Sequence, residues 1–255
     1  LGYPGTSGLS AMDYRLTDGC TDPLGSEAFY SEQLLRLPDS LWCYRLPLDS
    51  PETTPLPALQ NGYVTFGSFN NFNKVNRPCI ELWAALLHAV PDSRLLMVTV
   101  PEGVARQALT QQFATLGVEA RRLKFHGKLS NNEFRQMLQT VDMTLDPITV
   151  NGATTTCESI SLGVPVISLV GNRYLSRAGL SILNAAGLAD FAANSPEAYI
   201  KIACDFAADL PLLAAIRSRL HAQVAASPLT DEVEFTRNLE TLYRNAWRKW
   251  CSSGD

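Results

Sequence analysis

The feature that most constrains the fold is a regular alternation of apolar and amphipathic segments between residues 63 and 187. The apolar segments predict strands at 63–70, 94–100, 122–127, 141–147 and 164–170. The amphipathic segments predict helices at 77–90, 102–116, 130–138, 154–162 and 176–187. Strands that alternate with helices form right-handed βαβ units and therefore a parallel sheet. We predict an α/β fold with a doubly wound, Rossmann-like domain.

The segments on either side of this alternation complete the predicted organisation. The C-terminal side predicts helices at 196–208, 210–226 and 231–250. The N-terminal side predicts a glycine-rich loop at 1–8, a strand at 12–18, a helix at 26–37 and a strand at 40–44. Four prolines within residues 47–61 indicate a linker and a domain boundary. The last helix carries an apolar stripe that we expect to pack on the core, made of Phe235, Leu239, Leu242, Tyr243 and Trp247.

The composition excludes several function classes. A formal net charge of -4 gives no general attraction for polyanions, so we expect neither nucleic-acid nor membrane binding. No apolar run approaches the about 20 residues that cross a bilayer. The 6 cysteines are scattered without a C-x-x-C pair, which argues against structural zinc and favours reduced thiols in a cytoplasmic protein. Because the chain opens with Leu1 and not with Met, we expect it to begin inside a longer protein.

The stretch "NGATTTCES" (151–159) places three β-branched threonines at the start of a predicted helix. The first N–H groups of a helix lack internal partners and carry partial positive charge, so this end suits an anion. Thr154, Thr155 and Thr156 keep the backbone approachable and add hydroxyl donors. Glu158 lies one turn further on the same face, where a carboxylate suits the paired hydroxyls of a ribose. The pattern indicates a nucleotide diphosphate; the alternative is an ordinary helix that Thr154 caps, with a solvated Glu158.

A second polar loop follows the first strand of the alternation, in "FGSFNNFNKVNR" (66–77). Asn70, Asn71, Asn73 and Lys74 leave a buried strand at the carboxyl edge of the sheet, where doubly wound folds bind ligands. A lysine there is a point charge suited to a pyrophosphate, and it would stabilise the charge of a departing diphosphate. The alternative is a solvated loop lysine. Two such loops from parallel strands together favour a nucleotide site.

With both loops identified, the chain resembles the catalytic region of the protein O-GlcNAc transferase and SPINDLY family, glycosyltransferase family 41. The matching stretches, which extend from residue 1 to residue 251, are "LGYPGTSG", "MDYRLTD", "FGSFNNFNK", "VDMTLD", "NGATTTCESISLGVPVISLVGNRYLSR" and "LETLYRNAWRKWC". The resemblance implies a GT-B fold of two Rossmann-like subdomains. Residues 1–58 would be the end of the first subdomain, residues 59–228 the donor-binding second subdomain, and residues 229–255 a C-terminal helix.

The resemblance also implies an activity and a set of phosphate contacts. The activity is inverting transfer of a sugar from a nucleotide diphosphate to Ser or Thr hydroxyls of proteins or peptides, without a metal or another cofactor. Lys74 matches the family lysine that contacts the donor diphosphate, and Asn71 stands where animal members have a glutamine. Thr154 and Thr155 match the paired threonines at the phosphates, and we assign Thr156 to the same group.

Further residues are assigned to the sugar, the base and the acceptor by the same resemblance. Glu158 matches an acidic ribose-binding position. Leu129 and Phe134 belong to the loop that holds the base, where Phe134 stacks on the base or packs in the core. Gly5 and Thr6 belong to the loop that faces the acceptor in relatives.

Departures from the family pattern leave the donor open. Animal O-GlcNAc transferases have histidine where this chain has Ala153, and they have lysine and histidine where it has Asn131 and Phe134. "FGSFNN" and "TTTCES" are closer to the plant SPINDLY proteins, which are similar to protein O-fucosyltransferases that use GDP-fucose. "GNRYLSR" instead resembles the O-GlcNAc transferases. We expect UDP-GlcNAc as the donor, with GDP-fucose as the alternative.

The resemblance places the histidine proposed to assist the acceptor, and the tetratricopeptide repeats that present substrates, upstream of Leu1. Of the 3 histidines, His88 and His221 lie within predicted helices and His126 ends a strand near the donor crevice. No general base is assigned, so we expect this fragment alone to be inactive. A nucleotide-sugar-binding scaffold without catalysis is a second hypothesis. A dinucleotide oxidoreductase or a P-loop enzyme is disfavoured, because neither glycine motif occurs in the sequence.

Overall fold

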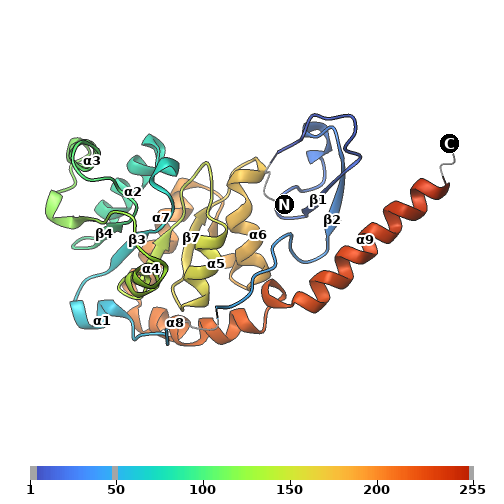
Figure 1. Cartoon of the computed structure of the whole chain (residues 1–255). Helices are drawn as coiled ribbons and strands as arrows, with labels where there is room; N and C mark the ends of the chain where they lie inside the picture. The colour runs from blue at the N-terminus through green and yellow to red at the C-terminus, as the bar shows by residue number, and fades with distance from the viewer. Residues whose placement is uncertain (1–4, 48–50, 253–255) are drawn as a thin grey trace.

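A computed structural model describes residues 5–47 and 51–252. Its centre is a six-stranded parallel sheet in the order β5-β4-β3-β6-β7-β8 (Figure 1). The strands are β3 (Thr65–Ser68), β4 (Arg94–Met97), β5 (Leu123–Phe125), β6 (Met143–Leu145), β7 (Val166–Leu169) and β8 (Ala192–Ala193). Each of the five predicted strands is present, within shorter bounds, and β8 was not predicted. The strand order reverses between β3 and β6, which makes this pair the switch point of a doubly wound sheet.

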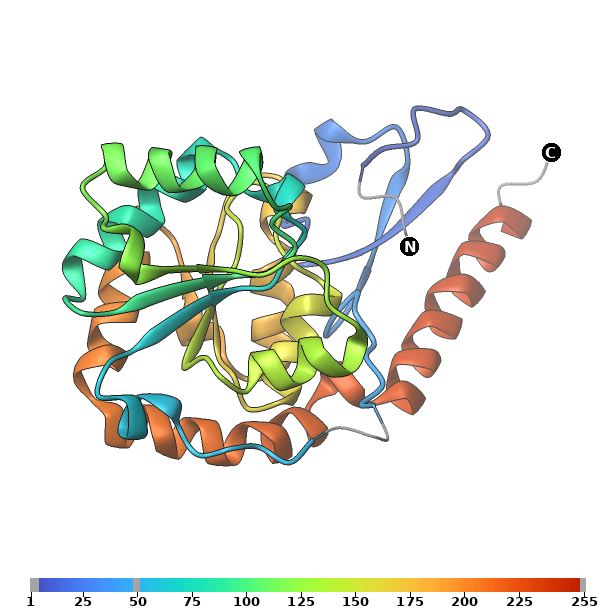
Figure 2. The same cartoon turned by 60° about the vertical axis from the view of Figure 1, so that its left-hand side comes forward.

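Helices flank the sheet on both sides (Figure 2). They are α2 (Arg77–Ala89), α3 (Val104–Thr115), α4 (Asn131–Leu138), α5 (Thr154–Ser161), α6 (Ala178–Ala185), α7 (Pro196–Ala208) and α8 (Leu210–Ala225). A capping box begins α4: the Ser130 side chain accepts from the N–H of Glu133, whose carboxylate accepts from the N–H of Ser130. Large apolar side chains from both layers, including Trp83 and Phe66, are fully buried between helices and sheet.

The N-terminal segment differs from its prediction. β1 (Tyr14–Asp18) pairs in parallel with β2 (Gln33–Leu37), so the helix predicted at 26–37 is wrong except for a 3₁₀ turn at Ser26–Phe29. The strand predicted at 40–44 is also wrong. This segment pairs with no strand, and the N–H of Tyr44 donates instead to the carbonyl of Leu229, in the segment between α8 and the last helix. A short helix, α1 (Pro57–Asn61), occupies the end of the predicted linker. Residues 48–50 of that linker, and residues 1–4 of the predicted N-terminal loop, lie outside the described residues.

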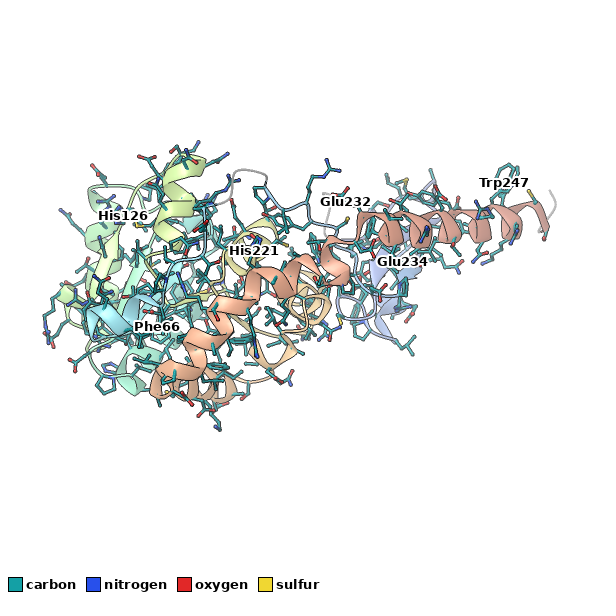
Figure 3. All side chains as sticks on the ribbon, turned by 90° about the horizontal axis from the view of Figure 1, so that it is seen from below. Phe66, His126, His221, Glu232, Glu234 and Trp247 are labelled. Atoms are coloured by element: carbon teal, nitrogen blue, oxygen red, sulfur yellow. The ribbon has the colours of Figure 1, made fainter. Side chains whose placement is uncertain are left out.

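The last helix, α9 (Glu232–Ser252), projects away from the main body alongside β1 and β2 (Figure 1, Figure 3). Phe235, Leu239 and Leu242 pack against a small cluster on that N-terminal segment. The outer part of the predicted stripe does not reach a core, since Tyr243 is 55% exposed and Trp247 is 62% exposed. The prediction that the whole stripe packs on the core is therefore wrong.

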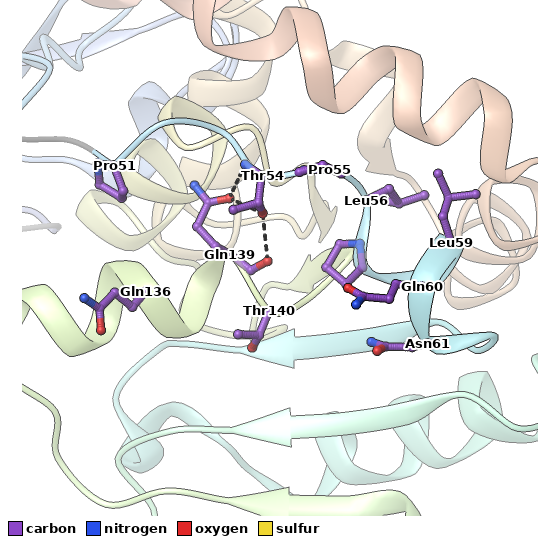
Figure 4. A pocket seen from close by; sticks show the side chains of 11 residues that line it. Pro51, Thr54, Pro55, Leu56, Leu59, Gln60, Asn61, Gln136, Gln139 and Thr140 are labelled. Atoms are coloured by element: carbon purple, nitrogen blue, oxygen red, sulfur yellow. Dashed lines mark hydrogen bonds between the residues drawn. The ribbon is translucent and has the colours of Figure 1, made fainter.

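The amino ends of the strands are tied to the proline-rich segment by a buried arginine. Arg217 of α8 is 1% exposed, and its guanidinium donates to the carbonyls of Thr54, Gln139 and Val141. Thr54 also bonds to the side chain of Gln139, beside a groove of about 740 Å³ that Leu56 helps to line (Figure 4). This groove lies at the edge of the sheet opposite to the switch-point loops.

Candidate nucleotide-sugar site

The two polar loops predicted from the sequence meet at the switch point between β3 and β6. Lys74 closes a 3₁₀ turn at Phe72–Lys74 after β3, and it is half-buried. Its ammonium donates to Oδ1 of Asn70 at 3.1 Å and to the carbonyl of Asn151, in the loop after β6, at 2.8 Å. Lys74 is therefore a fixed charge in the crevice, and the alternative of a solvated loop lysine is wrong.

Two opposing effects act on the charge of Lys74. Burial lowers the pKa of its ammonium, while the negative charge of Asp146 raises it. Asp146 is 0% exposed, and burial raises the pKa of its carboxyl to about 7. Burial is the larger of the two effects, so the pKa of Lys74 lies below its usual value, and the proximity of Asp146 limits this decrease.

The triple threonine begins α5, but the three side chains have different environments. Thr154 is the first residue of the helix and not its cap; the cap position is Ala153, which offers no side-chain acceptor. Thr154 is exposed, Thr155 is half-buried, and Thr156 is buried with a hydroxyl that has no partner among the described residues. Because no side chain caps α5, its first N–H groups remain free to meet an anion.

Gly152 shows how tightly the loop before α5 is packed. A Cβ placed on Gly152 would lie 2.6 Å from Oγ1 of Thr156 and 3.1 Å from both Oδ1 of Asn70 and Oδ1 of Asp146. Its N–H donates to Asp146 at 2.6 Å. A side chain at position 152 would have to displace these groups, because Asn70, Asp146 and Thr156 pack directly on the backbone of Gly152.

Asp146 is a site residue that the sequence reasoning missed. It directly follows β6 and accepts hydrogen bonds from Gly152, from Asn70 and from Ser168 of β7. The available signal was a carboxylate at the carboxyl end of a predicted strand, the edge at which doubly wound folds bind ligands.

Glu158, assigned to the ribose, is held by a neighbouring helix. Its carboxylate forms an ion pair of 2.9 Å with Arg135 of α4, and the two side chains are only 16% and 19% exposed. The alternative of a solvated Glu158 is therefore wrong. The ion pair fixes the carboxylate one turn below the exposed Thr154.

The residues assigned to the base lie on α4 and in the loop that precedes it. Phe134 packs edge-on against Phe69 with 5.4 Å between ring centroids, and Leu129 joins the same apolar cluster. Both pack in this cluster and remain partly exposed. Asn71 is exposed, and its side chain accepts from the N–H of Asn73 to cap the 3₁₀ turn.

The acceptor-side loop is anchored at its base by Glu32. The Thr6 hydroxyl donates to Glu32 at 2.7 Å, and Ser7 donates through its N–H and its hydroxyl. These bonds lower the pKa of the Glu32 carboxyl to about 2. Gly5 and Thr6 line a pocket of about 260 Å³ together with Arg173 from the loop after β7, which brings the N-terminal loop to the carboxyl edge of the sheet.

None of the three histidines has the geometry of an assigned base. His88 bonds to the carbonyl of Leu116, and His221, which is labelled in Figure 3, lies on α8 and bonds to the carbonyl of Ser161. His126 follows β5, and burial lowers the pKa of its imidazole. Within residues 5–47 and 51–252, no cluster of three or more His, Cys, Asp or Glu side chains is arranged to hold a metal ion. Over the same residues, no helix is long and apolar enough to span a bilayer.

Comparison with known proteins identifies relatives over nearly the whole chain. Residues 1–44 and 53–239 match the family model "Glycosyl transferase family 41". A Petunia hybrida protein named "Probable UDP-N-acetylglucosamine--peptide N-acetylglucosaminyltransferase SPINDLY" is 39% identical over 254 residues. That alignment covers 98% of this chain but only 27% of the relative, so the chain spans about a quarter of the length of such relatives.

Solved structures extend the likeness to three dimensions. A mutant of the Thermobaculum terrenum O-GlcNAc transferase is 31% identical and superimposes with a TM-score of 0.93, over 100% of this chain and 49% of that one. The glycosyltransferase WaaG gives a TM-score of 0.58 at 17% identity, over 92% of this chain and 64% of that one, which is a likeness of fold alone. Both are GT-B proteins, so the predicted fold class is confirmed.

Proposed function

The chain belongs to glycosyltransferase family 41, and we propose that it is the donor-binding part of an enzyme that transfers a sugar from a nucleotide diphosphate to Ser and Thr hydroxyls of proteins. In this proposal the reaction is an inverting displacement at the anomeric carbon. The acceptor hydroxyl attacks from the face opposite to the diphosphate, and no metal ion takes part. The protein acts in the cytoplasm and has nucleotide sugars and acceptor proteins or peptides as partners.

One observation carries the proposal: the Lys74 ammonium bonds to the carbonyl of Asn151, three residues before the uncapped start of α5. An ammonium and a helix N-terminus thus lie close together in one crevice, and both favour negative charge. Charge on the diphosphate grows as the bond to the sugar breaks. Fixed positive groups therefore stabilise the transition state more than the bound donor.

The other assigned residues complete the donor site in this proposal. Thr154 and Thr155 add hydroxyl donors at the phosphates, and the paired carboxylate of Glu158 accepts from the ribose hydroxyls. Phe134 and Leu129 contact the base from the facing cluster. Gly5 and Thr6 face the acceptor, while the general base lies in a part of the protein outside this chain. We therefore expect residues 1–255 alone to bind nucleotide but not to transfer sugar.

For the donor we propose UDP-GlcNAc, with GDP-fucose as the alternative. The name of the Petunia hybrida relative, which contains UDP-N-acetylglucosamine, and the likeness to an O-GlcNAc transferase support the first choice. Titration of the full-length protein with UDP and with GDP separates the two. Tighter binding of GDP would overturn the choice of UDP-GlcNAc.

Transfer of labelled sugar by the full-length protein tests the activity itself. Lys74→Ala should lower kcat by about 10²- to 10³-fold, the usual effect of removing one group that stabilises transition-state charge. Lys124→Ala removes an exposed lysine of β5 and should leave the rate unchanged. A wild-type protein that binds nucleotide but transfers no sugar would refute catalysis and support the scaffold hypothesis.

A further inference from the structure

Asp146 is a fully buried carboxyl group that the proposed mechanism leaves unused. Its Oδ1 accepts from the N–H of Gly152 at 2.6 Å and from the side-chain amide of Asn70 at 3.4 Å. Its Oδ2 accepts from the hydroxyl of Ser168 at 2.9 Å. An ionised carboxylate only accepts hydrogen bonds, so it suits three facing donors, whereas an asparagine would add donors of its own.

Two amide groups connect this carboxylate to the Lys74 ammonium. The side-chain amide of Asn70 donates to Asp146 through its nitrogen and accepts from Lys74 at 3.1 Å through its oxygen. The peptide group between Asn151 and Gly152 does the same, because its N–H donates to Asp146 and its carbonyl accepts from Lys74 at 2.8 Å. Both groups are planar, so the bond at one end orients the other end. Hydrogen bonds in such chains polarise and strengthen one another.

We propose that Asp146 is a positioning residue of the donor site, which holds the Lys74 ammonium beside the start of α5 through these two amides and keeps it charged. This inference rests on the proposed function, since the ammonium is held there to meet the donor diphosphate. Asp146 itself lies beneath the loop backbone and does not touch the ligand.

The charged and titratable groups around Asp146 support this role. Asp146 is the charged side chain that raises the pKa of Lys74. The other titratable groups that interact with it are Cys79 of α2 and Tyr199 of α7, and burial raises the pKa of both. The thiol and the phenol are therefore neutral around pH 7, and Lys74 is left as the cation that Asp146 influences.

The chain offers a matched control at the opposite end of β6. Asp142 is also a buried carboxylate, but it accepts from the N–H groups of Ala58 and Thr65, both at 2.7 Å, at the amino edge of the sheet. Asp142→Asn and Asp146→Asn each remove one buried carboxyl group at an end of β6. Only the second removes it from the edge that holds Lys74.

The experiment measures nucleotide affinity of the full-length protein by calorimetry from about pH 6 to about pH 10. The probe is UDP or GDP, whichever the wild type binds more tightly. Asp146→Asn should weaken binding by roughly 10- to 100-fold, the value of one misplaced charged contact. Binding should also be lost at high pH, where Lys74 loses its proton. This alkaline limit should lie at lower pH in Asp146→Asn, because Lys74 then lacks the anion that raises its pKa. Asp142→Asn should change the affinity by no more than about twofold and leave the alkaline limit in place.

The outcomes separate this inference from the proposed function. Wild-type affinity and an unchanged alkaline limit in Asp146→Asn would overturn the inference alone, and so would an equal change in Asp142→Asn. A wild type that binds neither nucleotide would refute the proposed function as well. If Asp146→Asn does not fold, Asn70→Ala decides, because it cuts one bridge and keeps the charge. It should weaken binding by about tenfold with the alkaline limit unchanged, and wild-type affinity would overturn the inference.

Discussion

Gly152→Ala should destabilise the protein through a steric conflict at the centre of the candidate site. The added methyl carbon would lie 2.6 Å from Oγ1 of Thr156, well inside a normal contact, and 3.1 Å from the oxygens of Asn70 and Asp146. Gly152 is not among the glycines with positive φ, so the backbone itself accepts alanine. Alanine also restricts the unfolded chain, which stabilises by about 0.4–1 kcal/mol. Against a packing cost of about 1–3 kcal/mol, we expect a net loss of about 1–2 kcal/mol in the free energy of unfolding.

A double-mutant cycle identifies the cause. Thr156→Ala removes a buried hydroxyl that has no partner in the described residues, so alone it should change the free energy of unfolding by less than about 1 kcal/mol. Combined with Gly152→Ala it removes the closest conflict, and the pair should recover about 1 kcal/mol relative to additivity.

Urea unfolding of the four proteins of this cycle measures these differences, with Gly127→Ala as the matched control. A Cβ on Gly127 would meet only Arg106, at an ordinary 3.8 Å. Gly127→Ala should therefore be neutral or slightly stabilising. Equal midpoints for Gly152→Ala and Gly127→Ala, or strict additivity in the cycle, would refute the steric reasoning.

Two further predictions concern the regions around the site. Arg217→Met should lower the free energy of unfolding by about 3–5 kcal/mol, because it leaves buried carbonyls unpaired. Arg219→Met, which changes an exposed arginine two residues away, should have little effect. Similar melting temperatures for the two variants would contradict this prediction. Glu32 has its pKa lowered from 4.5 to about 2 by Ser7 and Thr6, so its stabilisation of the acceptor-side loop is fully present above pH 4.5 and is lost as the pH falls through about 2. The Ser7 amide should be protected from hydrogen exchange above pH 4.5 and should lose this protection as the pH falls through about 2. In Glu32→Gln it should be unprotected at all pH values. An unprotected Ser7 amide in the wild type would show that Glu32 does not hold the loop.

The parallel sheet and its helices were predictable because each βαβ unit is a local pattern with its own start and stop signals. The segments at 26–37 and 40–44 were not, because their structure depends on distant partners. Gln33–Leu37 becomes a strand because β1 supplies its hydrogen bonds. Residues 40–44 have no neighbouring strand, and their backbone bonds instead to Leu229. Apolar periodicity in short segments does not identify such partners.

The candidate site was predictable in its location but not in its internal connections. The sequence pointed to Lys74 and the triple threonine, because polar residues that end buried strands converge at the switch point. It did not show that Asp146 lies beneath them, because a single aspartate at a strand end is equally typical of a solvated turn. The ion pair of Glu158 was hidden for a related reason: its partner, Arg135, lies on a different helix.

Residues 38–47, which follow β2, and residues 226–232, which lead from α8 to α9, run next to each other. Two contacts connect these segments: a hydrogen bond of 2.8 Å from the N–H of Tyr44 to the carbonyl of Leu229, and an ion pair of 2.6 Å between Arg45 and Glu232. The N-terminal segment is also held at the other edge of the sheet, where the Ser181 hydroxyl donates to Asp18 at 2.6 Å and Arg177 donates to the carbonyl of Cys20 at 2.7 Å. Contacts at both edges of the sheet therefore keep β1 and β2 in one orientation against the sheet domain, and the Gly5–Thr6 loop that Glu32 holds keeps its place with them.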